Sequence, residues 1–169
     1  MVEIIEGHGA EFIADVRGLF REYAASLGID LCFQGFDAEL AALPGDYAPP
    51  SGRLLLAKDA GRVAGCVALR QIEDRVCEMK RLFVRSAFRG AGIGRRLAEA
   101  IVAAGREIGY RKMRLDTLST MSEAIALYES LGFHESEPYY NNPIPTAVYF
   151  DLELRDRPCN PTHGTGRTD

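Results

Sequence analysis

The sequence predicts a mixed α/β (α+β) domain in which helices pack against a largely antiparallel sheet. Three segments with strand patterns, 53–58, 63–71 and 76–84, follow one another, and a tight turn at 59–61 joins the first two, as in an antiparallel meander. After this meander the apolar spacing changes between helical and strand periods in the order helix, strand, helix, strand. Together these patterns predict one domain over residues 1–154.

The elements before the meander are helical. Apolar residues recur at helical spacing over 12–27, and Gly28 is placed to end that helix. Asp37 is placed to cap a short second helix that ends near Leu43. The prolines and glycines of residues 44–52 then predict a long loop.

The elements after the meander alternate between helix and strand. Apolar residues over 93–108 line one face of a helix that ends at Gly109, and a short strand is predicted at 112–116. A second amphipathic helix covers 121–131, and a last strand covers 146–154. A parallel strand pair around the first of these helices requires a right-handed crossover, and together with the meander it makes the predicted sheet mixed. About four predicted helices flank this sheet.

Composition excludes several classes of protein. The 169 residues are 47% hydrophobic and 26% charged, which is ordinary for a packed globular domain, and residues 155–169 have the composition of a flexible tail. No apolar run could span a bilayer and the first residues do not resemble a signal peptide, so we expect a cytoplasmic protein without a membrane partner. The net charge of −4 argues against a nucleic-acid partner. The four cysteines and three histidines lack metal-ligand spacing, so no metal is expected.

The most informative segment lies where the third predicted strand ends and the next helix begins, and it reads LFVRSAFRGAGIGRRL over residues 82–97. The first N–H groups of a helix lack internal acceptors and carry partial positive charge. Gly90, Gly92 and Gly94 allow the backbone to approach a ligand closely. Positive charge around the same turn comes from Arg85, Arg89, Arg95 and Arg96. The segment therefore predicts a phosphate-binding turn.

Three glycine-rich phosphate-binding motifs could explain this turn. The simpler interpretation is that the glycines only allow the chain to turn and bind no ligand. A P-loop needs Gly-Lys-Ser/Thr, which is missing. A dinucleotide fingerprint counted from Gly90 has Arg95 in place of its last glycine, although Asp116 stands at a distance suited to a ribose contact. The antiparallel lead-in also disagrees with that fingerprint, which leaves the pattern Arg89-x-x-Gly92-x-Gly94.

This pattern resembles the pyrophosphate-binding signature of the GNAT superfamily of N-acetyltransferases. About forty residues later, AIALYESLGF over 124–133 resembles the second signature of that superfamily. The order of predicted elements over 1–154 fits as well. The resemblance implies a central, mostly antiparallel sheet with a splayed parallel pair, acetyl-CoA as the acetyl donor, and a primary amine on a small molecule or peptide as the acceptor.

The resemblance also implies a cofactor site built from the end of the third strand and the glycine turn. The N–H of Leu82 would face the thioester carbonyl as the oxyanion donor, and Val84 would hold the pantetheine arm. The residues implied to bind coenzyme A are Leu82, Phe83, Val84, Arg89, Gly90, Ala91, Gly92, Ile93, Gly94 and Arg95.

Two side chains are implied to move protons. Glu78 occupies the position of a carboxylate general base, acting directly or through water; the alternative is an ion pair with Lys80 on the same strand face. Tyr128 would protonate the departing thiolate; the alternative is an aromatic residue of the core. Met121 departs from the family pattern, because many relatives carry Asn at this position to contact the pantetheine.

The acceptor pocket of such a fold lies between the early helices and the C-terminal loop. The candidate acceptor-binding residues are Tyr23, Phe33, Tyr140 and Asn141, with Gln34, Tyr139 and Asn142 beside them. The alternative for the loop residues is a solvated turn. Polyamines, amino acids, aminoglycosides and protein amines all stay open as acceptors, as do a homodimer, a longer acyl chain and a hydroxyl acceptor. A non-catalytic acyl-CoA-sensing or interaction domain of the same fold is the alternative function.

Overall fold

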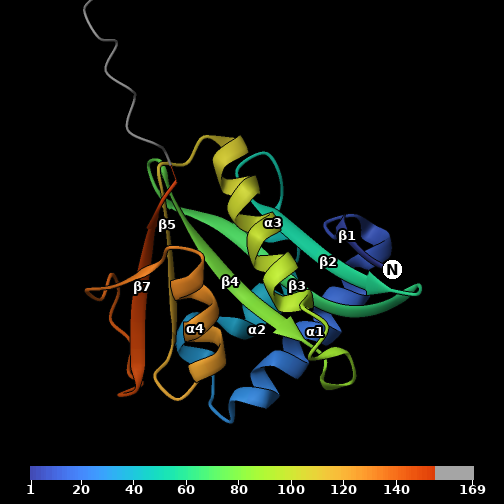
Figure 1. The fold of residues 1–169 in the computed structure, drawn as a ribbon, viewed down its shortest axis with the longest axis horizontal. Coiled ribbons are helices and arrows are strands. Elements are labelled where there is room, and N and C mark those ends of the chain that lie inside the picture. The colour runs from blue at the N-terminus through green and yellow to red at the C-terminus, as the bar shows by residue number, and fades with distance from the viewer. Residues whose placement is uncertain (155–169) are drawn as a thin grey trace, which may run out of the picture.

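The computed structural model describes residues 1–154 and consists of one seven-stranded sheet with helices on both faces (Figure 1). The strand order is β1-β2-β3-β4-β5-β7-β6, and every neighbouring pair is antiparallel except β4 and β5, which are parallel. The mixed sheet with a single parallel pair confirms the predicted fold class. The predicted tail over 155–169 lies outside the described residues.

The strands include the predicted meander, and two strands are additional to the predicted ranges, β1 at the N-terminus and the short β6 before the last strand. Strand β1 was not predicted, because the adjacent Ile4 and Ile5 break the alternation of apolar and polar residues; this edge strand forms by pairing with β2. The strands are β1 (Val2–Glu6), β2 (Arg53–Asp59), β3 (Arg62–Glu73), β4 (Val76–Val84), β5 (Lys112–Leu118), β6 (His134–Ser136) and β7 (Ala147–Glu153).

The four α-helices lie where the sequence predicts them, three from apolar spacing and the second from its proposed cap and end. Gly28 ends the first in the left-handed conformation. The predicted cap at Asp37 is wrong: the second helix begins one residue earlier, after Gly35, so the Asp37 carboxylate lies in the first turn near the positive end of the helix dipole. The helices are α1 (Ile13–Leu27), α2 (Phe36–Ala42), α3 (Ile93–Ile108) and α4 (Ser122–Ser130), and short 3₁₀ turns are η1 (Ala10–Phe12), η2 (Cys32–Gln34), η3 (Gly45–Tyr47) and η4 (Ser86–Phe88).

The sheet separates two hydrophobic cores, and alternation along each strand assigns side chains to them. In β2, Leu55 and Ala57 are buried with α3, whereas Leu54 and Leu56 are buried with α1 and α2. Figure 1 shows α3 and α4 in front of the sheet and α1 and α2 behind it. No helix among residues 1–154 has the length and apolarity needed to cross a bilayer.

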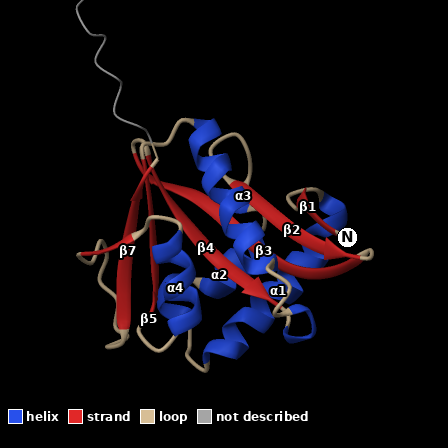
Figure 2. Cartoon of the chain, viewed as in Figure 1, coloured by secondary structure: helices blue, strands red, loops and turns tan. Residues whose placement is uncertain are grey.

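The parallel pair separates partway along its length, and this separation positions the site. Strand β4 pairs with β5 only at its start, and the last matched residues are Glu78 and Arg114. Farther along, Arg81 adopts a positive φ of 60°, and the register between β3 and β4 shifts between Cys66 and Ala68. Such a bulge bends a strand. Strands β4 and β5 therefore diverge, as Figure 2 shows.

Candidate active site

A cleft with a volume of about 370 Å³ fills the gap between the diverging strands and continues to the N-terminus of α3. Its walls come from residues 79–84 of β4, residues 115–118 of β5, and parts of α1 and α4. Most of the predicted site residues meet here, although they come from distant parts of the sequence. Those that line the cleft are Tyr23, Phe33, Leu82, Phe83, Val84, Arg89, Gly90, Gly92, Ile93, Gly94 and Tyr128.

The glycine turn leaves open space at the start of α3. Gly90 and Gly92 have positive φ angles of 85° and 76°, and a Cβ placed on either would meet no atom within 4 Å. The first hydrogen bond of the helix runs from the N–H of Arg96 to the carbonyl of Gly92 at 3.1 Å. The N–H groups of residues 93–95 therefore lack intrahelical acceptors, and they suit an anion such as a diphosphate.

The arginines of this segment do not gather at the turn as the sequence suggested. Arg89 lines the cleft, and its Nε donates to the carbonyl of Val84 at 3.1 Å. Ala91 and the other three arginines lie outside the cleft wall. The guanidinium groups of these three arginines donate hydrogen bonds outside the cleft: Arg85 to Glu22, Arg95 to Ser130 and Arg96 to the carbonyl of Val2.

Two backbone N–H groups of β4 face the gap that β5 leaves. The N–H of Arg85 donates to the carbonyl of Ala64 in β3 at 2.8 Å. Because backbone groups alternate between the two edges of a strand, the N–H groups of Leu82 and Val84 point to the opposite edge. At this edge β5 has already separated from β4, so both N–H groups are directed into the cleft.

Tyr128 combines core contacts with a position in the cleft wall. Its ring packs edge-on against Phe133 at a centroid distance of 5.8 Å, and its hydroxyl has no hydrogen-bond partner among the described residues. Burial raises the pKa of this hydroxyl above its ordinary value, and Tyr23 and Asp116 add to the rise. The hydroxyl therefore keeps its proton and can donate it inside the cleft.

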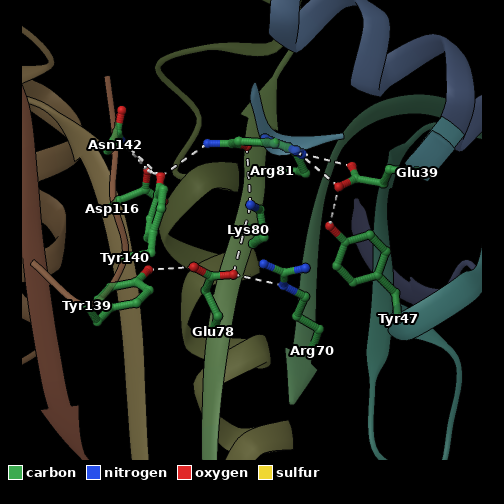
Figure 3. Close-up of polar contacts among 11 residues, drawn as sticks. Glu39, Tyr47, Arg70, Glu78, Lys80, Arg81, Asp116, Tyr139, Tyr140 and Asn142 are labelled. Carbon is green, nitrogen blue, oxygen red and sulfur yellow. Dashed lines mark hydrogen bonds and ion pairs between the residues drawn. The ribbon is translucent and has the colours of Figure 1, made fainter. Parts of the chain in front are cut away.

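Glu78 lies beside the cleft and is almost fully buried, with 1% exposure. Its Oε1 accepts a 2.8 Å hydrogen bond from Nε of Arg70 and lies 3.8 Å from Nζ of Lys80. Its Oε2 accepts the hydroxyl of Tyr139 at 2.5 Å (Figure 3). The ion pair with Lys80 thus exists, but Arg70 and Tyr139 are the closer partners.

A second pocket of about 340 Å³ adjoins the cleft and contains Glu78. Phe33, Gln34 and Lys80 line both spaces. Nζ of Lys80 donates to Oε1 of Gln34 at 3.2 Å, and Nε2 of Gln34 donates to the hydroxyl of Tyr140 at 3.3 Å. These hydrogen-bonded side chains form a partition between the cleft and the second pocket.

Asp116 lies on β5 in the cleft wall, opposite the bulged part of β4. Its Oδ2 accepts the hydroxyl of Tyr140 at 2.6 Å and the amide of Asn142 at 3.5 Å. No cationic side chain among residues 1–154 lies within ion-pair distance of it. Burial raises the pKa of the Tyr140 hydroxyl, and hydrogen bonding to Asp116 raises it further, so Tyr140 is the proton donor in this pair.

Residues 18–133 match the model of the acetyltransferase (GNAT) family. The chain belongs to the GNAT family. Among its relatives, an uncharacterized N-acetyltransferase of Schizosaccharomyces pombe is 45% identical over 142 residues, which cover 83% of this chain and 87% of the relative.

Two solved structures show the same GNAT fold at low sequence identity. A GNAT-family acetyltransferase from Staphylococcus aureus has a TM-score of 0.74 at 19% identity, and the match covers 92% of this chain and all 100% of that chain. YncA from Salmonella typhimurium, solved with its cofactor acetyl-CoA, has a TM-score of 0.66 at 17% identity, with coverage of 96% and 99%.

The sequence of this GNAT protein did not indicate every residue at the site. From the sequence, Asp116 was considered only as a ribose contact. It ends the short strand predicted at 112–116, and ligands of parallel sheets bind at the carboxyl ends of strands. This position could have indicated Asp116 as a site residue. Arg70 gave no signal, because its contact with Glu78 depends on strand register. Asn141 lines neither pocket, and Met121 lines the cleft and accepts a contact from Thr117 Oγ1 at 3.6 Å. No cluster of potential metal ligands occurs within residues 1–154.

Proposed function

We propose that this GNAT protein transfers the acetyl group of acetyl-CoA to a primary amine. The observation that carries the proposal is one continuous cleft that contains the open glycine turn, the inward N–H of Leu82 and the hydroxyl of Tyr128. Acetyl-CoA would supply the acetyl group as a thioester. The shared fold of YncA, solved with acetyl-CoA, supports this choice of donor.

The residues at the α3 end of the cleft fit coenzyme A. A diphosphate would be held by the free N–H groups of residues 93–95, and the open space over Gly90 and Gly92 leaves room for it. The inward backbone of Val84 would bind the amides of the pantetheine arm. Arg89, which lies in the same wall, would add positive charge.

Two groups farther along the cleft would act on the reacting thioester. The N–H of Leu82 would donate to the carbonyl oxygen as negative charge develops there, and such preorganised donors are usually the largest electrostatic contribution to catalysis. Tyr128, whose buried hydroxyl keeps its proton until negative charge develops on the sulfur, would give that proton to the departing thiolate.

Glu78 would take the proton that the acceptor amine must lose before it attacks. A lysine-like amine has a pKa of about 10.4 and is mostly protonated at neutral pH. The hydroxyl of Tyr139 offers a route, because its oxygen would accept the proton of the amine while its own proton passes to Glu78. Water would serve in the same way.

A second candidate for this base is Asp116, and a specific observation favours it. Asp116 lines the cleft itself, whereas Glu78 lines only the adjoining pocket. The carboxylate of Glu78 is already engaged by two cations, Arg70 at 2.8 Å and Lys80 at 3.8 Å. Asp116 has only neutral hydrogen-bond partners among the described residues.

The proposed function is tested by measuring acetyl-CoA binding and thiol release separately. We expect calorimetry to detect binding of acetyl-CoA, and a panel of primary amines to stimulate release of coenzyme A with formation of the N-acetyl product. Binding without release for any amine would instead support the acyl-CoA-sensing alternative. Failure to bind acetyl-CoA would refute the cofactor site.

A further inference from the structure

We infer that the acceptor carries a carboxylate beside its amine and that Arg70 and Lys80 bind this carboxylate in the second pocket. The inference rests on the proposed function and narrows its acceptor from amines in general to amino acids. It assigns a role to two cations that neither the glycine turn nor the acetyl-transfer step uses.

The second pocket is placed to hold the body of an acceptor. It adjoins the cleft, and Phe33, Gln34 and Lys80 belong to the walls of both spaces. A molecule held in the pocket would present its amine at this partition. The volume of about 340 Å³ is sufficient for a small amino acid.

Arg70 presents unused hydrogen-bond donors to this pocket. Its Nε donates to Glu78 at 2.8 Å, but neither terminal nitrogen donates to any group among residues 1–154. Figure 3 shows both terminal nitrogens without a contact to the other residues drawn. A guanidinium edge with free N–H groups matches the two oxygens of a carboxylate, which is the geometry of bidentate recognition.

Lys80 provides a second cation in the partition. Its side chain is 5% exposed, and its ammonium contacts Oε1 of Gln34 at 3.2 Å and Oε1 of Glu78 at 3.8 Å. Burial lowers the pKa of Lys80, against the opposing effect of Glu78. An additional anion near this ammonium would stabilise its charged form.

The charges that line the pocket leave positive charge uncompensated. Glu78 is the one buried carboxylate in the wall, and it faces both Arg70 and Lys80. Glu73 also belongs to the wall, but its side chain is exposed and therefore screened by solvent. The neighbouring Arg81 is neutralised by Glu39 through hydrogen bonds of 2.9 and 3.0 Å.

An α-amino acid joins the two recognition elements of the pocket. Its carboxylate and amine are attached to the same carbon, so a carboxylate on Arg70 and Lys80 would leave the amine near the hydroxyls of Tyr139 and Tyr140. These hydroxyls connect to Glu78 and Asp116, the two candidate bases. Phe33 and Ile72 leave apolar surface in the same pocket for a side chain.

The test compares each common L-amino acid with its own α-carboxamide, which keeps the amine and the side chain but removes the charge. We expect kcat/KM for release of coenzyme A to favour the best acid over its amide by about 10- to 100-fold, the effect of a hydrogen bond to a charged group. Arg70→Gln should lower this ratio severalfold, because only Lys80 then remains to bind the carboxylate, while the amide is still acetylated. Because the acid and its amide are measured with the same variant, any effect of the substitution on the action of Glu78 changes both rates equally and cancels in the ratio.

Two further variants keep the test decisive. Arg70→Lys keeps a charge beside Glu78 without the guanidinium fork, so it should fold and give an intermediate ratio. Arg53→Gln removes an arginine that lines neither pocket and should leave the ratio unchanged. Wild-type rates that are equal for acids and amides, or an equal loss for both in Arg70→Gln, would overturn the inference. No release with any amine would instead contradict the proposed function.

Discussion

The hydroxyl of Tyr139 donates a 2.5 Å hydrogen bond to the buried carboxylate of Glu78. The next residue, Tyr140, donates to Asp116 at 2.6 Å. Two adjacent residues of one loop therefore connect two carboxylates that lie on different strands, β4 and β5. Each pair offers a route by which a proton could leave the acceptor amine, and mutagenesis can distinguish the two routes.

Glu78→Gln removes the carboxylate but keeps an oxygen that can accept the Tyr139 hydroxyl. If Glu78 is the base, turnover at neutral pH should fall by about 10²- to 10⁴-fold, while KM for acetyl-CoA stays near that of the wild type. The residual activity should rise with pH, because a growing fraction of the amine is then already deprotonated. Steady-state kinetics over pH 6 to pH 10 provide the measurement.

Asp116→Asn is the matched comparison, because it changes the other carboxylate in the same way. Its turnover should be much less affected if Glu78 is the base. The reverse result, with Glu78→Gln active and Asp116→Asn inactive, would assign the base to Asp116. Thermal unfolding of both variants is needed as a control, since Glu78 compensates two neighbouring cations and its loss costs stability.

Tyr128→Phe should lower turnover by about 10²-fold or more and leave the affinity for acetyl-CoA unchanged. The variant should also fold normally, because the lost hydroxyl has no hydrogen-bond partner among the described residues and the ring keeps its contact with Phe133. Calorimetry of acetyl-CoA binding and measurement of kcat separate the two effects. Unchanged turnover would make Tyr128 a packing residue.

Tyr110→Phe is a control for this substitution. The hydroxyl of Tyr110 donates to the carbonyl of Ser51 at 2.5 Å, and Tyr110 lies outside the cleft wall. Its removal should therefore lower the free energy of unfolding by about 1 kcal/mol and leave kcat unchanged. The two tyrosines should thus show opposite patterns, one affecting turnover and the other stability.

Gly92→Glu should weaken acetyl-CoA binding by about 100-fold or more, because a carboxylate in the glycine turn would repel the diphosphate. Gly61→Glu is the control. Gly61 has a φ of 77°, against 76° for Gly92, and a Cβ on either would meet no atom within 4 Å. Both variants place the same charged side chain at a nearly equal positive φ, so equal affinities by calorimetry would refute the diphosphate site.

The features that the sequence predicted are those encoded by contiguous residues. The glycine turn at 89–94 and the helix over 93–108 depend on local spacing, so they could be predicted without the fold. The predicted helix cap at Asp37 is wrong because the N-cap residue is Gly35, two residues earlier, and the helix already begins at Phe36. Strand β1 was not predicted because its residues do not alternate regularly between apolar and polar, and the strand depends on pairing with β2.

The second pocket could not be predicted because its residues meet only through tertiary structure. Arg70 reaches Glu78 through the register of β3 and β4, and Gln34 reaches Tyr140 across 106 residues of sequence. The bulge that separates β4 from β5 is centred on Arg81, which adopts a positive φ without being glycine. Nothing in the local sequence indicates such a bulge.

Stability should fall as the pH rises above about 8.5, because two buried thiols keep their protons in the folded state. Burial raises the pKa of Cys77 to about 12 and that of Cys66 still higher, whereas an unfolded thiol has a pKa of about 8.5. Above that pH the folded state binds more protons than the unfolded state, so the free energy of unfolding decreases by up to about 1.4 kcal/mol per pH unit for each thiol. Lys80, whose pKa burial lowers, contributes in the opposite direction.

A comparison of variants isolates the effect of the thiols from that of Lys80. The double variant Cys66→Ala and Cys77→Ala should lose stability at every pH, because both side chains are fully buried. Its free energy of unfolding should nevertheless decline less steeply than that of the wild type between pH 8.5 and pH 9.5. Urea unfolding under reducing conditions measures both slopes. Equal slopes would mean that the two thiols are not kept protonated by the fold, since Lys80 is common to both proteins.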